Sequence, residues 1–197
     1  MLEAREIGQA VKAFLGLSYA PIGVKILTED DGRPGEPLAE GARFCPFHPH
    51  LLGESTFILR PGDLECPNVD LILGFTRPRY VDVQPRIAGE TKAVRLGPLE
   101  EADVVLFTLN ANQAMTLAVL LGGVEAECKG EIAVCGEALA RAYNTGKPSL
   151  TLLCRGALDF GPFAKEELVV AVPYQDFLRL PQAMVKYATL SQAAIDH

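Results

Sequence analysis

The 197-residue chain lacks tryptophan, has only three histidines, and contains no long apolar run. Runs such as residues 117–121 fall far short of the about 20 apolar residues that a helix needs to cross a bilayer. The formal net charge is −7 and there is no basic tract, which argues against nucleic acid or an anionic membrane as the main partner. The first six residues lack the basic and apolar regions of a secretory signal. We therefore expect a soluble, cytoplasmic protein.

Several motifs that would identify a function are also absent from the sequence. Neither GxxxxGK[ST] nor GxGxxG occurs, which removes the two common phosphate-binding loops. Neither HExxH nor GxSxG occurs, which removes the usual zinc protease and the nucleophile elbow. There is no CxxC, so neither a thioredoxin-type pair nor a zinc ribbon is supported. Any function must therefore be sought in dispersed residues.

The apolar fraction of 49% is enough for one sizeable core, and we expect a single compact domain over residues 1–197. An acidic segment rich in glycine and proline, residues 29–41, is expected to be a surface loop. Hydrophobic periodicity and turn residues predict strands at residues 21–27, 56–59, 92–96, 104–109, 149–154 and 168–172. They predict helices at residues 7–15, 67–73, 113–121 and 129–143 and from Pro181 onward. The fold class is therefore α/β or α+β, with a mixed β-sheet flanked by helices.

The five cysteines are the unusual feature of the composition: Cys45, Cys66, Cys128, Cys135 and Cys154. An odd number in a reducing compartment argues against disulfides, which leaves buried inert thiols, metal ligands or redox-active thiols. Proline follows both Cys45 and Cys66, and a proline in the first helical turn would put the cysteine at the N-cap, where a thiolate is stabilised. Cys154 is expected to end a strand and to precede a turn.

Each of these residues also has a purely structural interpretation. A free cysteine commonly behaves as a small buried hydrophobe, and the spacings match no metal motif. His48 and His50 could supply nitrogen ligands, but a His-Pro-His sequence is more often a surface turn. Lys25 could contact an anion, or its stem could pack while the amine reaches water. Arg155 could hold an anion or be ordinary surface charge.

A set of spaced landmarks resembles a known family. The landmarks include Cys, Gly and Gln-Ala-Met positions in the order Gly16-Leu17, residues 21–25, Arg43-Phe44-Cys45, Cys66, Leu73-Gly74-Phe75, residues 110–115, Cys135, and Cys154-Arg155-Gly156. Together they resemble domain-of-unknown-function family 169, a group of uncharacterised prokaryotic and archaeal proteins. The resemblance implies that Cys45, Cys66, Cys135 and Cys154 are family landmarks, whereas Cys128 is not. It also draws attention to Lys25 and Gln113.

The leading hypothesis is a metal-cluster protein in which Cys45, Cys66, Cys135 and Cys154 converge. Thiolate ligands suit an iron–sulfur cluster or tetrahedral zinc, and ligands dispersed over a well-cored fold favour the cluster. Lys25, Gln113 and Arg155 are then candidates for contacting a bound small molecule.

Two alternatives belong to different functional classes. The first is a metal-free small-molecule-binding protein or thiol enzyme, with Cys66 or Cys45 as a nucleophile of low pKa. The second is a subunit with a structural role, which either holds a structural zinc or binds a partner protein and has inert cysteines. A homodimer is considered in each case because it is the commonest oligomer.

Overall fold

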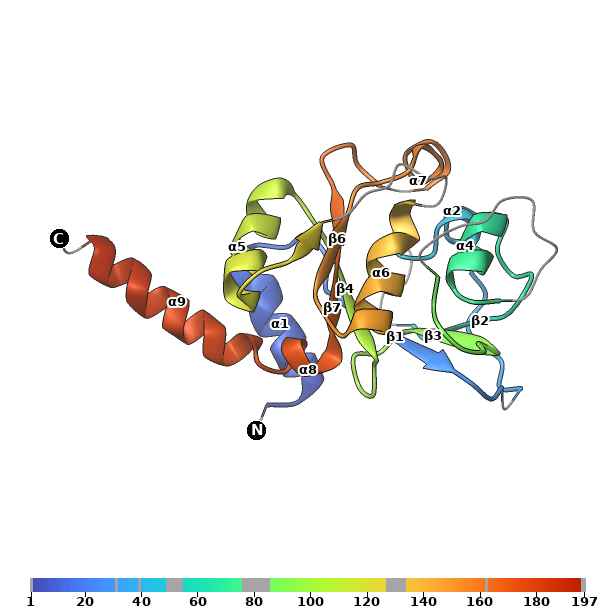
Figure 1. Cartoon of the computed structure of the whole chain (residues 1–197), viewed down its shortest axis with the longest axis horizontal. Coiled ribbons are helices and arrows are strands. Elements are labelled where there is room, and N and C mark those ends of the chain that lie inside the picture. The colour runs from blue at the N-terminus through green and yellow to red at the C-terminus, as the bar shows by residue number, and fades with distance from the viewer. Residues whose placement is uncertain are drawn as a thin grey trace.

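The computed structural model describes residues 2–30, 32–38, 40–48, 55–75, 86–126, 134–161 and 163–195 (Figure 1). Its helices are α1 (Ala4–Leu15), α2 (Glu40–Phe44), α4 (Pro67–Ile72), α5 (Ala111–Leu121), α6 (Val134–Thr145), α7 (Arg155–Phe160), α8 (Tyr174–Phe177) and α9 (Leu180–Ile195). Its strands are β1 (Ile22–Leu27), β2 (Phe57–Leu59), β3 (Ala93–Gly97), β4 (Val104–Leu109), β5 (Glu125–Ala126), β6 (Ser149–Thr151) and β7 (Leu168–Pro173).

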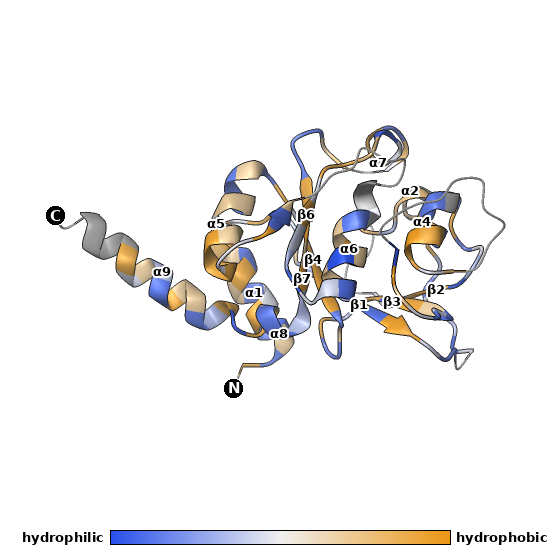
Figure 2. Ribbon diagram, viewed as in Figure 1, coloured by the Kyte–Doolittle hydropathy of each residue, from blue (hydrophilic) through white to orange (hydrophobic). Residues whose placement is uncertain are grey.

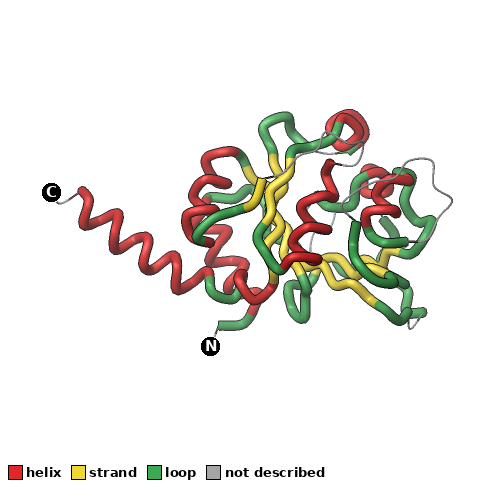
Figure 3. Tube along the Cα trace, in the orientation of Figure 1, coloured by secondary structure: helices red, strands yellow, loops and turns green. Residues whose placement is uncertain are grey.

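The strands form one seven-stranded sheet in the order β2-β3-β1-β4-β7-β6-β5 (Figure 3). Neighbouring strands are antiparallel except β5 and β6, which are parallel, so the sheet is mixed. Helices α1 and α5 lie on one side of it and α6 on the other (Figure 1). The predicted mixed sheet flanked by helices is confirmed.

Strand β4 shows why the centre of the sheet is apolar on both faces. All six of its residues are buried, as its unalternating Val-Val-Leu-Phe sequence predicts. Val104 and Leu106 pack into a core with α4 and α6, whereas Val105 and Phe107 pack into a second core with α1 and α5. The sheet therefore separates two cores. The first contains Cys45 and Cys66, with Cys154 packed against it, and is called the cysteine core below.

The structure adds helices where the sequence predicts turns or a loop. Residues 155–156 begin α7, although Arg-Gly after a strand is typical of a turn. Helix α2 begins inside the segment 29–41, of which residues 32–38 have no helix or strand. Both helices are short, with six and five residues, and such helices lack a long periodic pattern. Across the described ranges, no helix is both long enough and apolar enough to cross a membrane.

Candidate functional site

Cys66 lies at the N-cap of α4, as the Cys-Pro sequence predicts. Pro67 occupies the first helical position, where its missing N–H costs nothing. The Cys66 side chain is buried in the core beneath the sheet. The backbone amides of Asn68 and Val69 face its sulfur, although no capping hydrogen bond forms there.

Cys154 lies at the N-cap of α7 in the same way. Its Sγ accepts a hydrogen bond from the Ala157 backbone N–H at 3.4 Å, and the thiol is half-buried. The adjoining turn packs closely against α2, because a Cβ at Gly156 would come 2.5 Å from Cε1 of Phe44. The glycine that suggests a turn therefore leaves room for the Phe44 ring in the helix packing.

Cys45 and Cys135 approach the same region from two further elements. Cys45 directly follows α2 and is 1% exposed. The Glu65 N–H donates to the Arg43 carbonyl at 2.8 Å, which holds the two cysteine-bearing segments side by side. Cys135 is in the first turn of α6, where a Cβ at Gly136 would come 2.7 Å from Cγ2 of Ile72 on α4. The expectation of an N-cap at Cys45 is wrong, since a helix ends before it.

The cysteine centre is defined here as Cys45, Cys66, Cys135 and Cys154. Figure 1 shows the elements that carry them, α2, α4, α7 and the start of α6, at one side of the molecule. Among the side chains that the structure describes, no three His, Cys, Asp or Glu residues form a group that could hold a metal ion. The Cys135 side chain and all of Cys128 and His50 are outside the described part, so these predictions stay open.

Burial controls the protonation of Cys66. Removal from water raises the pKa of its thiol above the ordinary value of 9.0, and the Asn68 and Val69 amides offset this only in part. The neighbouring Cys154 and Asp70 raise the pKa further, because a second negative charge is unfavourable there. The predicted low pKa at Cys66 is therefore wrong for the metal-free chain. The N-cap amides do act on the sulfur, but desolvation outweighs them.

Alkylation of the metal-free protein tests this protonation state. Iodoacetamide should modify Cys66 at pH 7.5 at least about tenfold more slowly than in the urea-unfolded chain, because only a thiolate reacts. The folded thiol keeps its proton to a higher pH than the unfolded one, so its alkylation rate should still be rising above pH 9.0, where the rate in the unfolded chain levels off. Peptide mass spectrometry against time gives the rate. Rapid labelling of Cys66 at pH 7 would restore the nucleophile hypothesis.

The three residues predicted to contact a small molecule lie apart from one another. Lys25 alternates on β1 with Val24 and Ile26, which face the cysteine core, so it points to the opposite face of the sheet. There its Nζ lies 2.6 Å from Oδ1 of Asp103, whose other oxygen accepts the Ile26 N–H at 2.8 Å. This carboxylate ties β1 to the start of β4.

Gln113 and Arg155 also have partners within the chain. Gln113 completes the N-terminal capping box of α5 with Asn110, and its Nε2 donates to the Gly16 carbonyl at 2.8 Å. It thereby joins α5 to the end of α1. Arg155 is largely exposed and pairs with Asp159 one turn along α7 at 2.6 Å. Of the three, only Arg155 is next to the cysteine centre.

His48 is buried rather than on a surface turn. It is 1% exposed, lies edge-on to the rings of Tyr19 and Phe163, and has Nε2 3.4 Å from a Glu167 oxygen. Two aromatic edges and a carboxylate hold the imidazole between segments distant in sequence. The sequence gives no sign of this packing, because each contact comes from another part of the chain.

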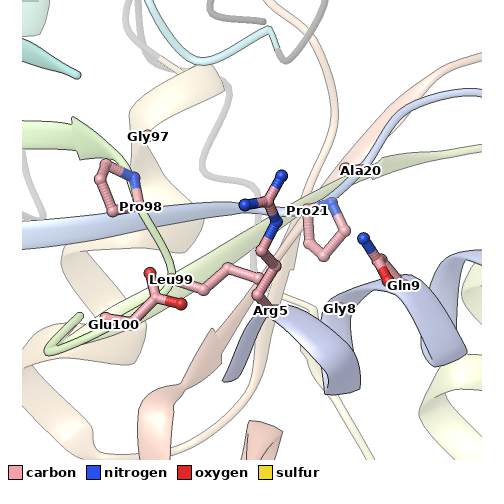
Figure 4. Close-up of a pocket in the computed structure, with 9 residues that line it drawn as sticks. All are labelled: Arg5, Gly8, Gln9, Ala20, Pro21, Gly97, Pro98, Leu99 and Glu100. Atoms are coloured by element: carbon pink, nitrogen blue, oxygen red, sulfur yellow. The ribbon is translucent and has the colours of Figure 1, made fainter. Parts of the chain in front are cut away.

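A pocket of about 440 Å³ opens between α1 and the turn that joins β3 to β4 (Figure 4). Arg5 and Gln9 of α1 stand at its rim with Glu100, and Pro21, Pro98 and Leu99 line it with apolar surface. No predicted site residue is among the described residues that line it. Arg5 and Glu100 belong to no recognisable sequence motif, so the sequence alone does not predict this pocket.

Comparison with known proteins identifies the family. Residues 78–183 match the model of DUF169, described as an uncharacterised ArCR family. The chain is 29% identical over 116 residues to uncharacterized protein MJ0308 of Methanocaldococcus jannaschii. That alignment covers 54% of this chain and 49% of the relative, so the chain spans about half the length of the relative it matches. No solved structure matches.

The matched segment contains Gln113, Cys135 and Cys154, whereas Lys25, Cys45 and Cys66 precede it. The segment covers more than half of the chain, which confirms the resemblance drawn from the spaced landmarks. The chain belongs to the DUF169 family.

Proposed function

We propose that the cysteine centre binds a metal–sulfur group, with an iron–sulfur cluster favoured over zinc. The observation that carries the proposal is the proximity of Cys154 to Cys66, which is close enough for a charge on Cys154 to raise the pKa of the Cys66 thiol. A bound cation offsets the repulsion between the two negatively charged sulfurs, since metal-bound thiols lose their protons outright. The described thiols alone do not complete a site, so the proposal requires Cys135 as a further ligand.

The surroundings of the thiols are those that suit metal-bound sulfur. Cys66 and Cys154 each begin a helix, and amide N–H groups face both sulfurs. Hydrogen bonds to the sulfurs and a dry setting are the features by which proteins tune such clusters. The cysteine core also includes apolar residues of β1, β3 and β4. A core of this size needs no zinc to hold the fold together, which favours the cluster.

A cluster held by four cysteines would supply electron transfer or a structural link, and one held by three would leave an iron open for Lewis-acid chemistry. The chain's own contribution is to bury the sulfurs, to direct amide donors at them and to exclude water. Arg155, at the first position of α7, is placed to attract an anion toward the centre.

Reconstitution of the metal-free protein tests the proposal. Ferrous iron and sulfide, added with a thiol reductant in the absence of oxygen, should give a broad absorption near ~400 nm and matched protein-bound iron and sulfide. Zinc added in a parallel sample should compete for the same cysteines, because both need thiolates. If neither metal stays bound after desalting, the cysteines are inert and the proposal is wrong. Tight binding of zinc without uptake of iron would mean that the cysteines form a zinc site instead of a cluster site.

A further inference from the structure

Helix α9 extends from the body of the protein with little of the described chain covering its outer part (Figure 1). Its first half is anchored, because Leu180 is buried and Tyr187 lies edge-on to Phe14 of α1 at 6.0 Å between ring centroids. Beyond that contact, Ala188, Thr189 and Leu190 are all exposed. Three successive helical residues point in three directions about 100° apart, so more than half of the helix circumference is bare at that point.

The exposed outer part of α9 is not expected to stay helical without a packing partner. Isolated helices shorter than about 12–15 residues are marginal in water, and most helical stability in proteins comes from packing of an apolar face. The exposed residues of α9 include Val185 at 70% and Leu190 at 62%. Figure 2 shows hydrophobic residues on α9 beyond the body of the molecule. A further surface is therefore needed to cover this part of the helix.

The neighbouring helix α5 also exposes apolar side chains to solvent. Met115 and Val119, one turn apart, are 63% and 58% exposed. Helix α5 contains no charged residue, and α9 contains only Lys186. The two helices have 11 and 16 residues, and their exposed side chains would form part of the roughly 20–30 residues that a standard interface takes from each partner.

Charge decides between the partners that could cover this face. The chain carries 25 acidic residues and a net charge of −7, so two copies repel each other wherever acidic surfaces meet. The nearly uncharged α5–α9 face is where two copies approach with the least repulsion. A membrane-surface helix would instead carry several lysines and arginines on its polar face. We propose that the α5–α9 face is the interface of a homodimer, in which α9 of each copy packs against α5 and α9 of the other.

Sedimentation of the 197-residue chain tests the dimer. The wild-type chain should sediment at twice its 21.2 kDa mass at micromolar concentration. Glutamates at two exposed positions, Val185→Glu with Leu190→Glu, should weaken dimerisation by about 100-fold or more, because the buried carboxylates would lack partners. Leu152→Glu, at 51% exposure between β6 and α7, is the control away from this face, and it should stay dimeric.

Hydrogen exchange in the wild-type chain gives a test that needs no variant. Backbone amides of residues 188–195 should be protected at high protein concentration and should exchange freely on dilution into the monomer range. A monomer at about 100 μM would overturn the proposal, as would a dimer that the glutamates at positions 185 and 190 leave unchanged. Binding of the wild-type protein to phosphatidylcholine–phosphatidylglycerol vesicles, abolished by those glutamates, would make the face a membrane site instead.

Discussion

Replacing Cys66 with serine should lower the iron bound per chain by at least about tenfold, because the substitution removes a ligand at the N-cap of α4. Cys154→Ser should have the same effect from α7, since the two thiols share one local charge environment. Iron and sulfide are measured on protein purified without oxygen. Both variants should lose the absorption near ~400 nm together with the iron.

Two further variants separate loss of a ligand from loss of the fold. Cys66→Ala removes the sulfur without placing a hydroxyl in a buried position, and it should lose iron equally. Cys128→Ser changes the cysteine outside the proposed ligand set, so it should keep wild-type iron. Wild-type iron in Cys66→Ala and Cys154→Ser together would exclude the cysteine centre as the site. Loss of iron from Cys128→Ser would show that the ligand set is wrong.

Gly23→Val should destabilise the protein by at least about 3 kcal/mol, the largest stability effect that we expect from a single exchange. Gly23 lies in β1, opposite Gly97 on β3 and Val105 on β4. A Cβ at this position would lie 1.9 Å from the carbonyl oxygen of Pro98. The obstacle is backbone held by the sheet, so it cannot rotate away as a side chain could. Urea denaturation gives the change in the free energy of unfolding.

Gly146→Ala is the matched control for this effect. Its φ of +67° favours glycine, but nothing lies within 4 Å of the new Cβ. Only the cost of a left-handed conformation, about 1–2 kcal/mol, should appear. Equal losses in the two variants would mean that the contact with Pro98 does not constrain β1.

The sequence predicts those elements of the fold that have a local cause. Apolar residues at positions 7, 11 and 15 predict α1, and Gly16 ends it with a φ of +63°. Asn110 predicts the start of α5 and does cap it. The unbroken apolar run of β4 predicts a strand buried on both faces, because neither side needs polar residues.

Features that depend on distant contacts could not be predicted in this way. Gly156 reads as a turn residue because its partner, the Phe44 ring, is more than 100 positions away. The raised pKa of Cys66 depends on burial by other elements, which a Cys-Pro dipeptide does not reveal. The segment around Lys25 has a structural role through the contacts of Gly23 and Asp103. A contact of Lys25 or Gln113 with a small molecule stays a prediction.

The central claim is that the cysteine centre holds an iron–sulfur cluster. The most direct measurement is an absorption spectrum of the 197-residue chain purified without oxygen, with iron, zinc and acid-labile sulfide determined on the same sample. The proposal predicts a broad shoulder near ~400 nm and equal amounts of iron and sulfide. A colourless protein without iron or sulfide, which also fails to take up iron on reconstitution, would contradict it.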